Sequence, residues 1–199
     1  MSDLFNKENS SNAFEAPLAD RMRPQSLDEV IGQNHLLGEE GPLQNMITSG
    51  IFSSIILWGP TGVGKTTIAR LLADHSNSHF EQISAIFTGV GDLKKVFEAA
   101  KFRRTNGHKT VIFVDEIHRF NKSQQDSFLP FLEDGTIILI GATTENPSFE
   151  LNPAILSRVQ VLVLERLNNA DLKKLLERAE GILGSEINLD LDAEIELLK

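Results

Sequence analysis

From Ser53 onward, runs of apolar residues alternate with segments whose apolar residues recur at helical spacing. Five runs have the length and the apolar content of buried parallel strands: 54–58, 80–83, 110–114, 136–140 and 159–164. Helical spacing is found between several of them, at 66–74, 91–102, 123–133 and 168–180. Because strands that alternate with helices are joined by crossover connections, this pattern predicts an α/β fold with a parallel sheet flanked by helices on both faces.

The two ends of the chain have a different pattern. Residues 1–16 are polar and rich in Asn, Ser and Glu, which predicts a flexible arm. The following segment, 18–33, is irregular, and Ser26 is placed to cap a short turn that carries Leu27 and Val30. Beyond Asn168 there are two amphipathic stretches, 170–183 and 190–198, and no further strand. We therefore expect a helical region to begin there.

Composition narrows the class of protein. A chain of 199 residues is one full domain, with room for part of a second. It has no cysteine, which excludes disulfides and thiolate zinc sites and fits a reducing compartment. The net charge of −9 argues against a protein that coats nucleic acid through bulk positive charge. The sequence has neither a membrane-spanning run nor a signal peptide, so we expect a cytoplasmic protein.

The most specific motif is Gly59-Pro60-Thr61-Gly62-Val63-Gly64-Lys65-Thr66, which matches the phosphate-binding pattern G-x-x-x-x-G-K-[ST]. An apolar strand precedes it and a helical segment follows, as that pattern requires. Glycines let backbone N–H groups wrap around phosphate oxygens, and the helix N-terminus adds partial positive charge. Lys65 is expected to reach the β- and γ-phosphates and Thr66 to ligate Mg²⁺. The alternative, a chance glycine-rich turn, does not explain this placement.

A second motif lies at the end of the apolar strand 111–114, where Asp115 and Glu116 follow directly. This is the Walker B arrangement. Asp115 is expected to hold Mg²⁺, directly or through water, and Glu116 to polarise the attacking water as general base. Two solvated loop carboxylates are the alternative interpretation. The adjacent glutamate favours hydrolysis, since a P-loop kinase or a nucleotide sensor does not need it.

These motifs, followed by Ile137–Thr144 and by Leu156-Ser157-Arg158, resemble the AAA+ ATPases of the clamp-loader branch. Four longer segments look like the replication-associated recombination protein A family, the bacterial relative of the Werner-helicase-interacting ATPase: RMRPQSLDEVIGQNHLL, ILWGPTGVGKTT, FVDEIHRFNKSQQDSFLPFLEDGT and GATTENPSFELNPAILSR. The resemblance covers about residues 17–183. It implies a P-loop NTPase (AAA+) domain over 17–166, followed by the start of a helical lid over 167–199.

The resemblance also implies roles for single residues. Thr144, or else Thr143, matches the sensor residue that orients the lytic water. Arg158 matches an arginine finger that acts on ATP held by a neighbouring subunit of a homo-oligomeric ring. The segment 30–33 matches the lining of the adenine pocket. The expected nucleotide-binding residues are Ile31, Gly32, Gly59, Pro60, Thr61, Gly62, Val63, Gly64, Lys65, Thr66 and Thr67. The alternatives are a structural threonine, a surface arginine and a core isoleucine.

Positive charge is concentrated in one segment, 94–122. It holds eight Lys or Arg and three Asp or Glu, a net charge of +5, so the rest of the chain carries −14. Such asymmetry indicates a face that meets an anionic partner, although a solvated helix face is the alternative. The resemblance favours DNA as the partner, single-stranded or gapped. His118, Arg119 and Lys122 follow the Walker B motif, where a DNA-facing element could signal to Glu116.

The motifs therefore predict an ATPase that uses Mg²⁺, and the resemblance implies that it acts on DNA at stalled or gapped replication forks, associated with the nucleoid and in contact with replication proteins. Two alternatives stay open. The first is a clamp-loader subunit or a Holliday-junction branch-migration motor, against which the run FNKSQQDSFLPFLEDGT argues. The second is a nucleotide-binding module with negligible hydrolysis, because the expected lid is incomplete at Lys199.

Overall fold

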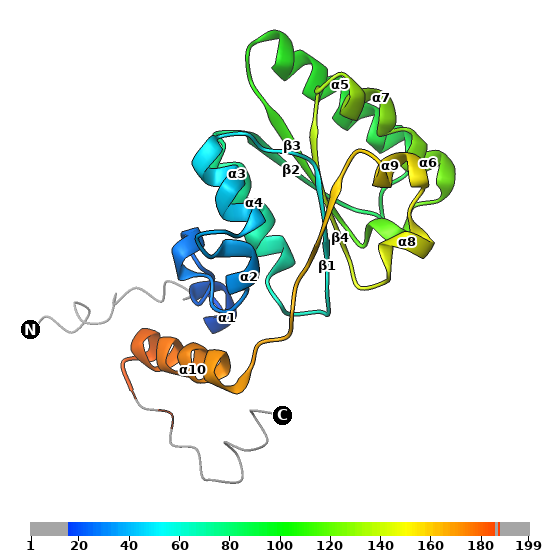
Figure 1. Cartoon of the computed structure of the whole chain (residues 1–199). Coiled ribbons are helices and arrows are strands. Elements are labelled where there is room, and N and C mark those ends of the chain that lie inside the picture. Colours follow the sequence, from blue (N-terminus) through cyan, green and yellow to red (C-terminus); the bar gives the residue numbers. More distant parts are fainter. Residues whose placement is uncertain (1–15, 186, 188–199) are drawn as a thin grey trace, which may run out of the picture.

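A computed structural model describes residues 16–185 and residue 187 of the chain. Its centre is a five-stranded parallel sheet in the order β2-β3-β4-β1-β5. The strands are β1 (Ile55–Trp58), β2 (His79–Ser84), β3 (Thr110–Asp115), β4 (Ile138–Thr143) and β5 (Gln160–Val163). Helices pack on both faces, as Figure 1 shows, so the predicted α/β fold is confirmed.

Each face of the sheet has its own hydrophobic core. Helices α3 (Pro42–Ser49) and α4 (Lys65–His75) contribute to one core, which includes the buried strand residues Leu57, Phe113 and Ile140. Helix α5 (Val90–Thr105) contributes to the other core, which includes Ile56, Ile112 and Leu139. Neighbouring strand residues therefore point to opposite cores, as the pleat requires. Because β1, β3 and β4 are buried on both sides, their sequences are continuously apolar.

Two predicted elements differ from the structure for identifiable reasons. The helix expected over 123–133 is divided into α6 (Lys122–Asp126) and α7 (Leu129–Glu133). Pro130 explains the break, because a proline ring excludes the carbonyl four residues earlier, here that of Asp126. The strand expected over 136–140 begins later, because the N–H of Thr136 donates to the Asp134 carboxylate and that of Ile137 to the Phe131 carbonyl. It then runs on to Thr143.

Strand β5 was expected to be buried like the others, and this is wrong. It lies at the edge of the sheet and pairs only with β1. Gln160, Val161 and Val163 are exposed, and Leu162 is its buried residue. An apolar run with a single buried position cannot be distinguished by composition from a central strand.

The segment before β1 is more regular than expected. It contains α1 (Leu18–Arg21), the 3₁₀ helix η1 (Leu27–Glu29) and α2 (Asn34–Leu37). Ser26 precedes η1 as predicted, but its side chain makes no capping hydrogen bond. Short helices also connect the later strands: η2 (Ile117–Arg119), α8 (Pro147–Glu150) and α9 (Pro153–Leu156).

The last described helix, α10 (Asn169–Leu183), confirms the amphipathic stretch that begins after Asn168. Asn168 caps it, since its side chain accepts a hydrogen bond from the N–H of Asp171. The stretch at 190–198 lies outside the described residues, as does most of the expected N-terminal arm, 1–15. Among the described residues no helix is long and apolar enough to cross a bilayer.

The N-terminal segment is tied to the connection between β5 and α10 by Gln33, which is 5% exposed and has a left-handed backbone, with φ 61°. Its amide nitrogen donates to the Glu165 carbonyl at 2.7 Å, and its amide oxygen accepts from the Glu165 N–H at 3.0 Å. Arg178 of α10 adds a second link, because its guanidinium lies 2.7 Å from the Glu29 carboxylate. The Gln25 N–H and, to a smaller extent, Arg178 lower the pKa of Glu29. Both ends of the described chain are therefore joined beside the sheet.

Replacing Gln33 tests this link. Gln33→Ala removes two hydrogen bonds of the peptide group of Glu165 and is expected to lower the free energy of unfolding by about 1–2 kcal/mol. Urea denaturation followed by circular dichroism measures the change. Gln25→Ala is the control, because the side chain of Gln25 is exposed and, within the described part of the chain, its one hydrogen bond is to the Arg23 carbonyl. Equal effects of the two substitutions would contradict the structural role of Gln33.

Candidate functional site

The phosphate-binding motif forms the turn between β1 and α4. Gly62 and Gly64 have φ values of +81° and +94°, which the glycines of the motif adopt without strain. Gly59 is required for a different reason: a Cβ atom there would lie 2.5 Å from the carbonyl oxygen of Leu164. The motif therefore turns back tightly over the end of β5. Its last two residues open α4, so the amino end of that helix faces the turn.

Lys65 lies inside this turn and is 8% exposed. Its ammonium donates hydrogen bonds to the carbonyls of Gly59 and Pro60, at 2.7 and 2.6 Å. Burial lowers the pKa of Lys65, and the nearby carboxylates of Glu116 and Asp115 act in the opposite direction. A buried cation without a full counter-charge favours an anion, and phosphate is the anion that such a turn is built to hold.

The two carboxylates come from the end of β3. Asp115 is the last residue of that strand and pairs in register with Ser84. Glu116 follows in the left-handed region, with φ 55° and ψ 44°, and its side chain is 25% exposed. Such a backbone conformation is uncommon for a non-glycine residue. It turns the chain directly into η2, so both carboxylates stay at the carboxyl edge of the sheet, beside Lys65.

The two candidate sensor threonines have different surroundings. Thr143 ends β4 and is fully buried, and its hydroxyl oxygen lies 2.9 Å from Nδ1 of His118. Thr144 is the next residue and is partly exposed, so its side chain is the accessible one of the pair. The other ring nitrogen of His118 lies 3.3 Å from the carboxylate of Glu116. Sequence reasoning placed His118 near Glu116 but gave no indication of its contact with Thr143.

A cavity of about 180 Å³ adjoins the phosphate loop. Ile31, Thr67 and the loop residues 62–64 line it, together with Leu167 from the connection after β5 and Leu175 and Arg178 from α10. Gly32 lies behind it, and a Cβ there would be 2.7 Å from the Leu167 side chain. The structure therefore brings the predicted adenine segment to the phosphate loop. The structure also adds Leu175 and Arg178 to the lining of this cavity. The sequence did not indicate them, because α10 contains no nucleotide-binding motif.

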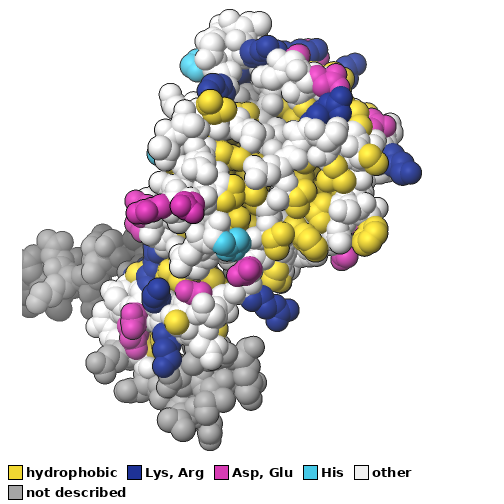
Figure 2. Space-filling view, viewed as in Figure 1, with side chains coloured by type: hydrophobic (Ala, Val, Ile, Leu, Met, Phe, Trp, Pro, Cys, Tyr) yellow, Lys and Arg dark blue, Asp and Glu magenta, His cyan; other side chains and the backbone are white. Residues whose placement is uncertain are grey.

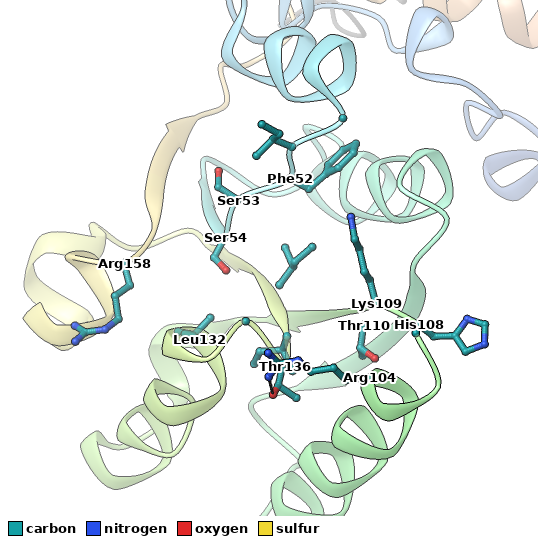
Figure 3. Close-up of a pocket in the computed structure, with 16 residues that line it drawn as sticks. Phe52, Ser53, Ser54, Arg104, His108, Lys109, Thr110, Leu132, Thr136 and Arg158 are labelled. Carbon is teal, nitrogen blue, oxygen red and sulfur yellow. Dashed lines mark hydrogen bonds between the residues drawn. The ribbon is translucent and has the colours of Figure 1, made fainter.

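Arg158 is far from this edge. It follows α9, and its guanidinium donates to the Glu133 carboxylate and to the Ala154 carbonyl. It also lines a cavity of about 590 Å³ at the amino edge of the sheet, with Ser54, Thr110 and Ile138. In Figure 3 its side chain points away from the other labelled residues of that cavity. Arg158 therefore cannot reach a phosphate held by Lys65 of the same chain.

The basic segment 94–122 divides into two groups in space. Helix α5 has 16 residues and is about 24 Å long, so its ends lie at opposite edges of the sheet. We call Lys94, Lys95, Arg119 and Lys122 the carboxyl-edge group, because Gln124 beside Lys122 bonds to Thr88 just before α5. Arg103, Arg104 and Lys109 form the amino-edge group, in which Arg103 pairs with Glu81 and Arg104 with Asp134. Lysine and arginine side chains are accordingly scattered over the face shown in Figure 2, and do not form a single patch there.

Comparison with known proteins agrees with this geometry. A family model described as "ATPase family associated with various cellular activities (AAA)" matches residues 55–167. Replication-associated recombination protein A of Haemophilus influenzae is 51% identical over 175 residues, and that of Escherichia coli is 53% identical over 170 residues. These alignments cover 88% and 85% of this chain but 39% and 38% of the relatives, so the chain spans about two fifths of their length.

Two further similarities are informative. ATPase WRNIP1 of Dictyostelium discoideum is 47% identical over 180 residues, which cover 88% of this chain and 20% of that protein. Among solved structures, the Thermotoga maritima RuvB Holliday junction branch migration motor is 30% identical with a TM-score of 0.72, covering 88% of this chain and 59% of that one. The resemblance inferred from the motifs is confirmed.

Proposed function

Because the chain belongs to the ATPase family associated with various cellular activities, we propose that it binds ATP with Mg²⁺ and hydrolyses it to act on DNA at stalled or gapped replication forks. The observation that carries the proposal is the position of Lys65. Its buried ammonium lies in a phosphate-binding turn and faces two carboxylates of β3. A turn with only a structural purpose does not need a buried cation there.

Each predicted residue has a role in this proposal. The N–H groups of 61–66 and the amino end of α4 bind the phosphates, and Lys65 exchanges its bonds to the Gly59 and Pro60 carbonyls for phosphate oxygens. The cavity beside Ile31 takes the adenine. Glu116 accepts a proton from the attacking water, and Thr144, the accessible threonine after β4, orients that water.

The donor set fits a magnesium ion. The hydroxyl of Thr66 and the carboxylate of Asp115 are hard oxygen ligands, the type that Mg²⁺ prefers in combination with substrate phosphates. When bound, Mg²⁺ neutralises charge on the β- and γ-phosphate oxygens. Asp115 and Thr66 would hold the ion, and Glu116, one residue beyond β3, stays available for the water.

Arg158 acts on a second copy of the chain in this proposal. It lies at the amino edge of its own sheet, whereas Lys65 lies at the carboxyl edge. Its reach therefore fits a neighbouring subunit in a ring, where a guanidinium stabilises charge on the transferred phosphoryl group. The unit 17–166 would hold the nucleotide, and the helical region from 167 would close over it as a lid.

DNA is the proposed partner of the carboxyl-edge group. In the described part of the chain, Lys94, Arg119 and Lys122 of this group have no ion pair and Lys95 pairs with Asp92, whereas in the amino-edge group Arg103 and Arg104 are paired and Lys109 is not. Cations without pairing partners can neutralise phosphates at little cost. Arg119 also follows His118 and lies close to Glu116. A protein that acts on single-stranded or gapped DNA would lie in the cytoplasm at the nucleoid, together with replication proteins. The names of the relatives support recombination over branch migration, because their identity exceeds that of RuvB.

The first test is Glu116→Gln. The amide keeps the size of the side chain but cannot accept the water proton, so kcat is expected to fall by about 10²–10⁴-fold while ATP affinity stays within about twofold. Phosphate release measures kcat, and titration with a fluorescent ATP analogue measures affinity. Glu39→Gln is the control, since it makes the same change at an exposed position. Unchanged turnover in Glu116→Gln would exclude this residue as the base.

The position of Arg158 predicts dependence on assembly. ATP turnover per subunit is expected to rise with protein concentration, and Arg158→Ala to lower it by about 10³-fold or more. Mixing Arg158→Ala with Lys65→Ala should restore part of the activity, because the second variant donates its arginine to the intact loop of the first. Turnover by the monomer that equals turnover at high concentration would contradict action on a neighbour.

DNA binding by the carboxyl-edge group is tested with Lys94→Ala/Lys122→Ala. Each lost phosphate contact should reduce the slope of log affinity against log salt by about 0.7 for single strands, so the pair should reduce it by about 1.4. Fluorescence anisotropy with labelled single-stranded DNA over a range of salt measures both quantities. Lys109→Ala/Lys174→Ala is the control, because it removes two positive charges outside the carboxyl-edge group. Equal losses in both variants would indicate bulk charge instead of a defined surface.

A further inference from the structure

The ring of His118 connects two elements of the site that are far apart in sequence. Its side chain is 8% exposed, so both ring nitrogens depend on partners within the protein. Nδ1 lies 2.9 Å from the hydroxyl oxygen of Thr143, and Nε2 lies 3.3 Å from a carboxylate oxygen of Glu116. The contact with Thr143 spans 25 residues of sequence and joins η2 to the end of β4.

The groups around Thr143 and His118 determine which atom donates and which accepts in each contact. The Thr143 hydroxyl oxygen accepts a hydrogen bond from the N–H of Glu145 at 3.0 Å, and its one proton has two acceptors within reach: Nδ1 of His118 at 2.9 Å and the Glu145 carbonyl at 3.2 Å. Because Nε2 lies 3.3 Å from a carboxylate, which can only accept, a neutral ring carries its proton on Nε2, and Nδ1 is then the acceptor that receives the Thr143 proton. A neutral imidazole that accepts at Nδ1 carries its own proton on Nε2. A proton on Nε2 then lies near the Glu116 carboxylate, one oxygen of which is 3.3 Å from that nitrogen, and attracts it electrostatically.

Glu116 needs such a donor. Its backbone is left-handed, its side chain is partly exposed, and the ammonium of Lys65 attracts it, as the effect of Glu116 on the pKa of Lys65 indicates. Without a fixed partner the carboxylate would turn toward that ammonium, away from the position of an attacking water. The proton of a buried ring 3.3 Å away attracts the carboxylate and favours one orientation at little entropic cost.

We propose that His118 is a positioning residue: it holds the Glu116 carboxylate through Nε2–H and transmits to it the position of the turn after β4. That turn carries Thr144, the residue next to Thr143. The placement of the base is thereby coupled to the residue proposed to orient the attacking water. This inference rests on the proposed role of Glu116 in hydrolysis, and it concerns orientation instead of proton transfer by His118.

Two amide variants separate the contacts of His118. The nitrogen of a glutamine side chain can occupy the place of Nε2, whereas an asparagine side chain reaches only the place of Nδ1. His118→Gln is therefore expected to keep kcat within about threefold, while His118→Asn lowers it by about 10–100-fold, as misplacement of a reacting group does. The KM for ATP should stay within about twofold in both. Equal kcat values in the two variants, or a parallel rise of KM, would overturn the proposal.

A double-mutant cycle tests the link to Thr143. Thr143→Val is expected to lower kcat about 10-fold when residue 118 is histidine, because the tautomer of the ring is no longer fixed. The same substitution should have less than a twofold effect in the His118→Gln background, where no tautomer exists. Thr143→Ser should restore kcat. Additive effects in both backgrounds would show that Thr143 acts independently of His118 and would overturn the link. Thermal melts of each variant show whether a loss of kcat follows unfolding.

A spectroscopic measurement distinguishes failure of this inference from failure of the proposed function. Nitrogen-15 correlation spectra of the imidazole rings, assigned by the signal that His118→Gln removes, should show a neutral Nε2–H tautomer for His118. In Thr143→Val that preference should weaken. An Nδ1–H tautomer would overturn the proposal even if Glu116→Gln abolishes hydrolysis. An Nε2–H tautomer in a chain that does not hydrolyse ATP would refute the proposed function and leave the contact itself intact.

Discussion

The packing around Gly59 is the constraint on which the site depends. Strand β1 lies between β4 and β5, and Gly59 directly follows its last residue. The N–H of Gly59 donates to the Thr143 carbonyl at 3.1 Å, and the Leu164 carbonyl occupies the space that a Cβ would need. The beginning of the phosphate loop is thus fixed by the ends of both neighbouring strands. In a doubly wound sheet this is the point where the strand order reverses, and where ligands bind.

Local sequence was sufficient to predict those parts of the structure in which a specific residue type is needed at a specific position. The phosphate loop, the carboxylates after β3 and the helix after Asn168 could be predicted because glycine spacing, a charged strand end and a cap each leave a local signal. The break at Pro130 and the delayed start of β4 were also encoded locally, by a proline ring and by the side chain of Asp134. They were missed because a periodic apolar pattern outweighed single residues in the prediction.

The contacts between distant segments could not be predicted in this way. Gln33 gives no sign in sequence that its amide will bond to Glu165, 132 residues away. Arg178 lies on an ordinary amphipathic helix, yet it lines the cavity next to the phosphate loop. The basic segment looked continuous because sequence distance hides the length of α5, which separates its two ends. In each case the missing information is the three-dimensional course of the chain, which no local pattern contains.

The links made by Gln33 and Arg178 have a consequence for the order in which the protein forms during synthesis. The Arg178 side chain bonds to Glu29 across 149 residues of sequence, and the cavity beside Ile31 needs residues from both segments. All five strands are translated before α10, so the sheet can assemble on the ribosome while this cavity still lacks one wall. A nascent chain would then have the phosphate loop before the adjoining cavity is complete, and a ligand that contacts both could reach its full stabilising effect only after α10 had left the exit tunnel.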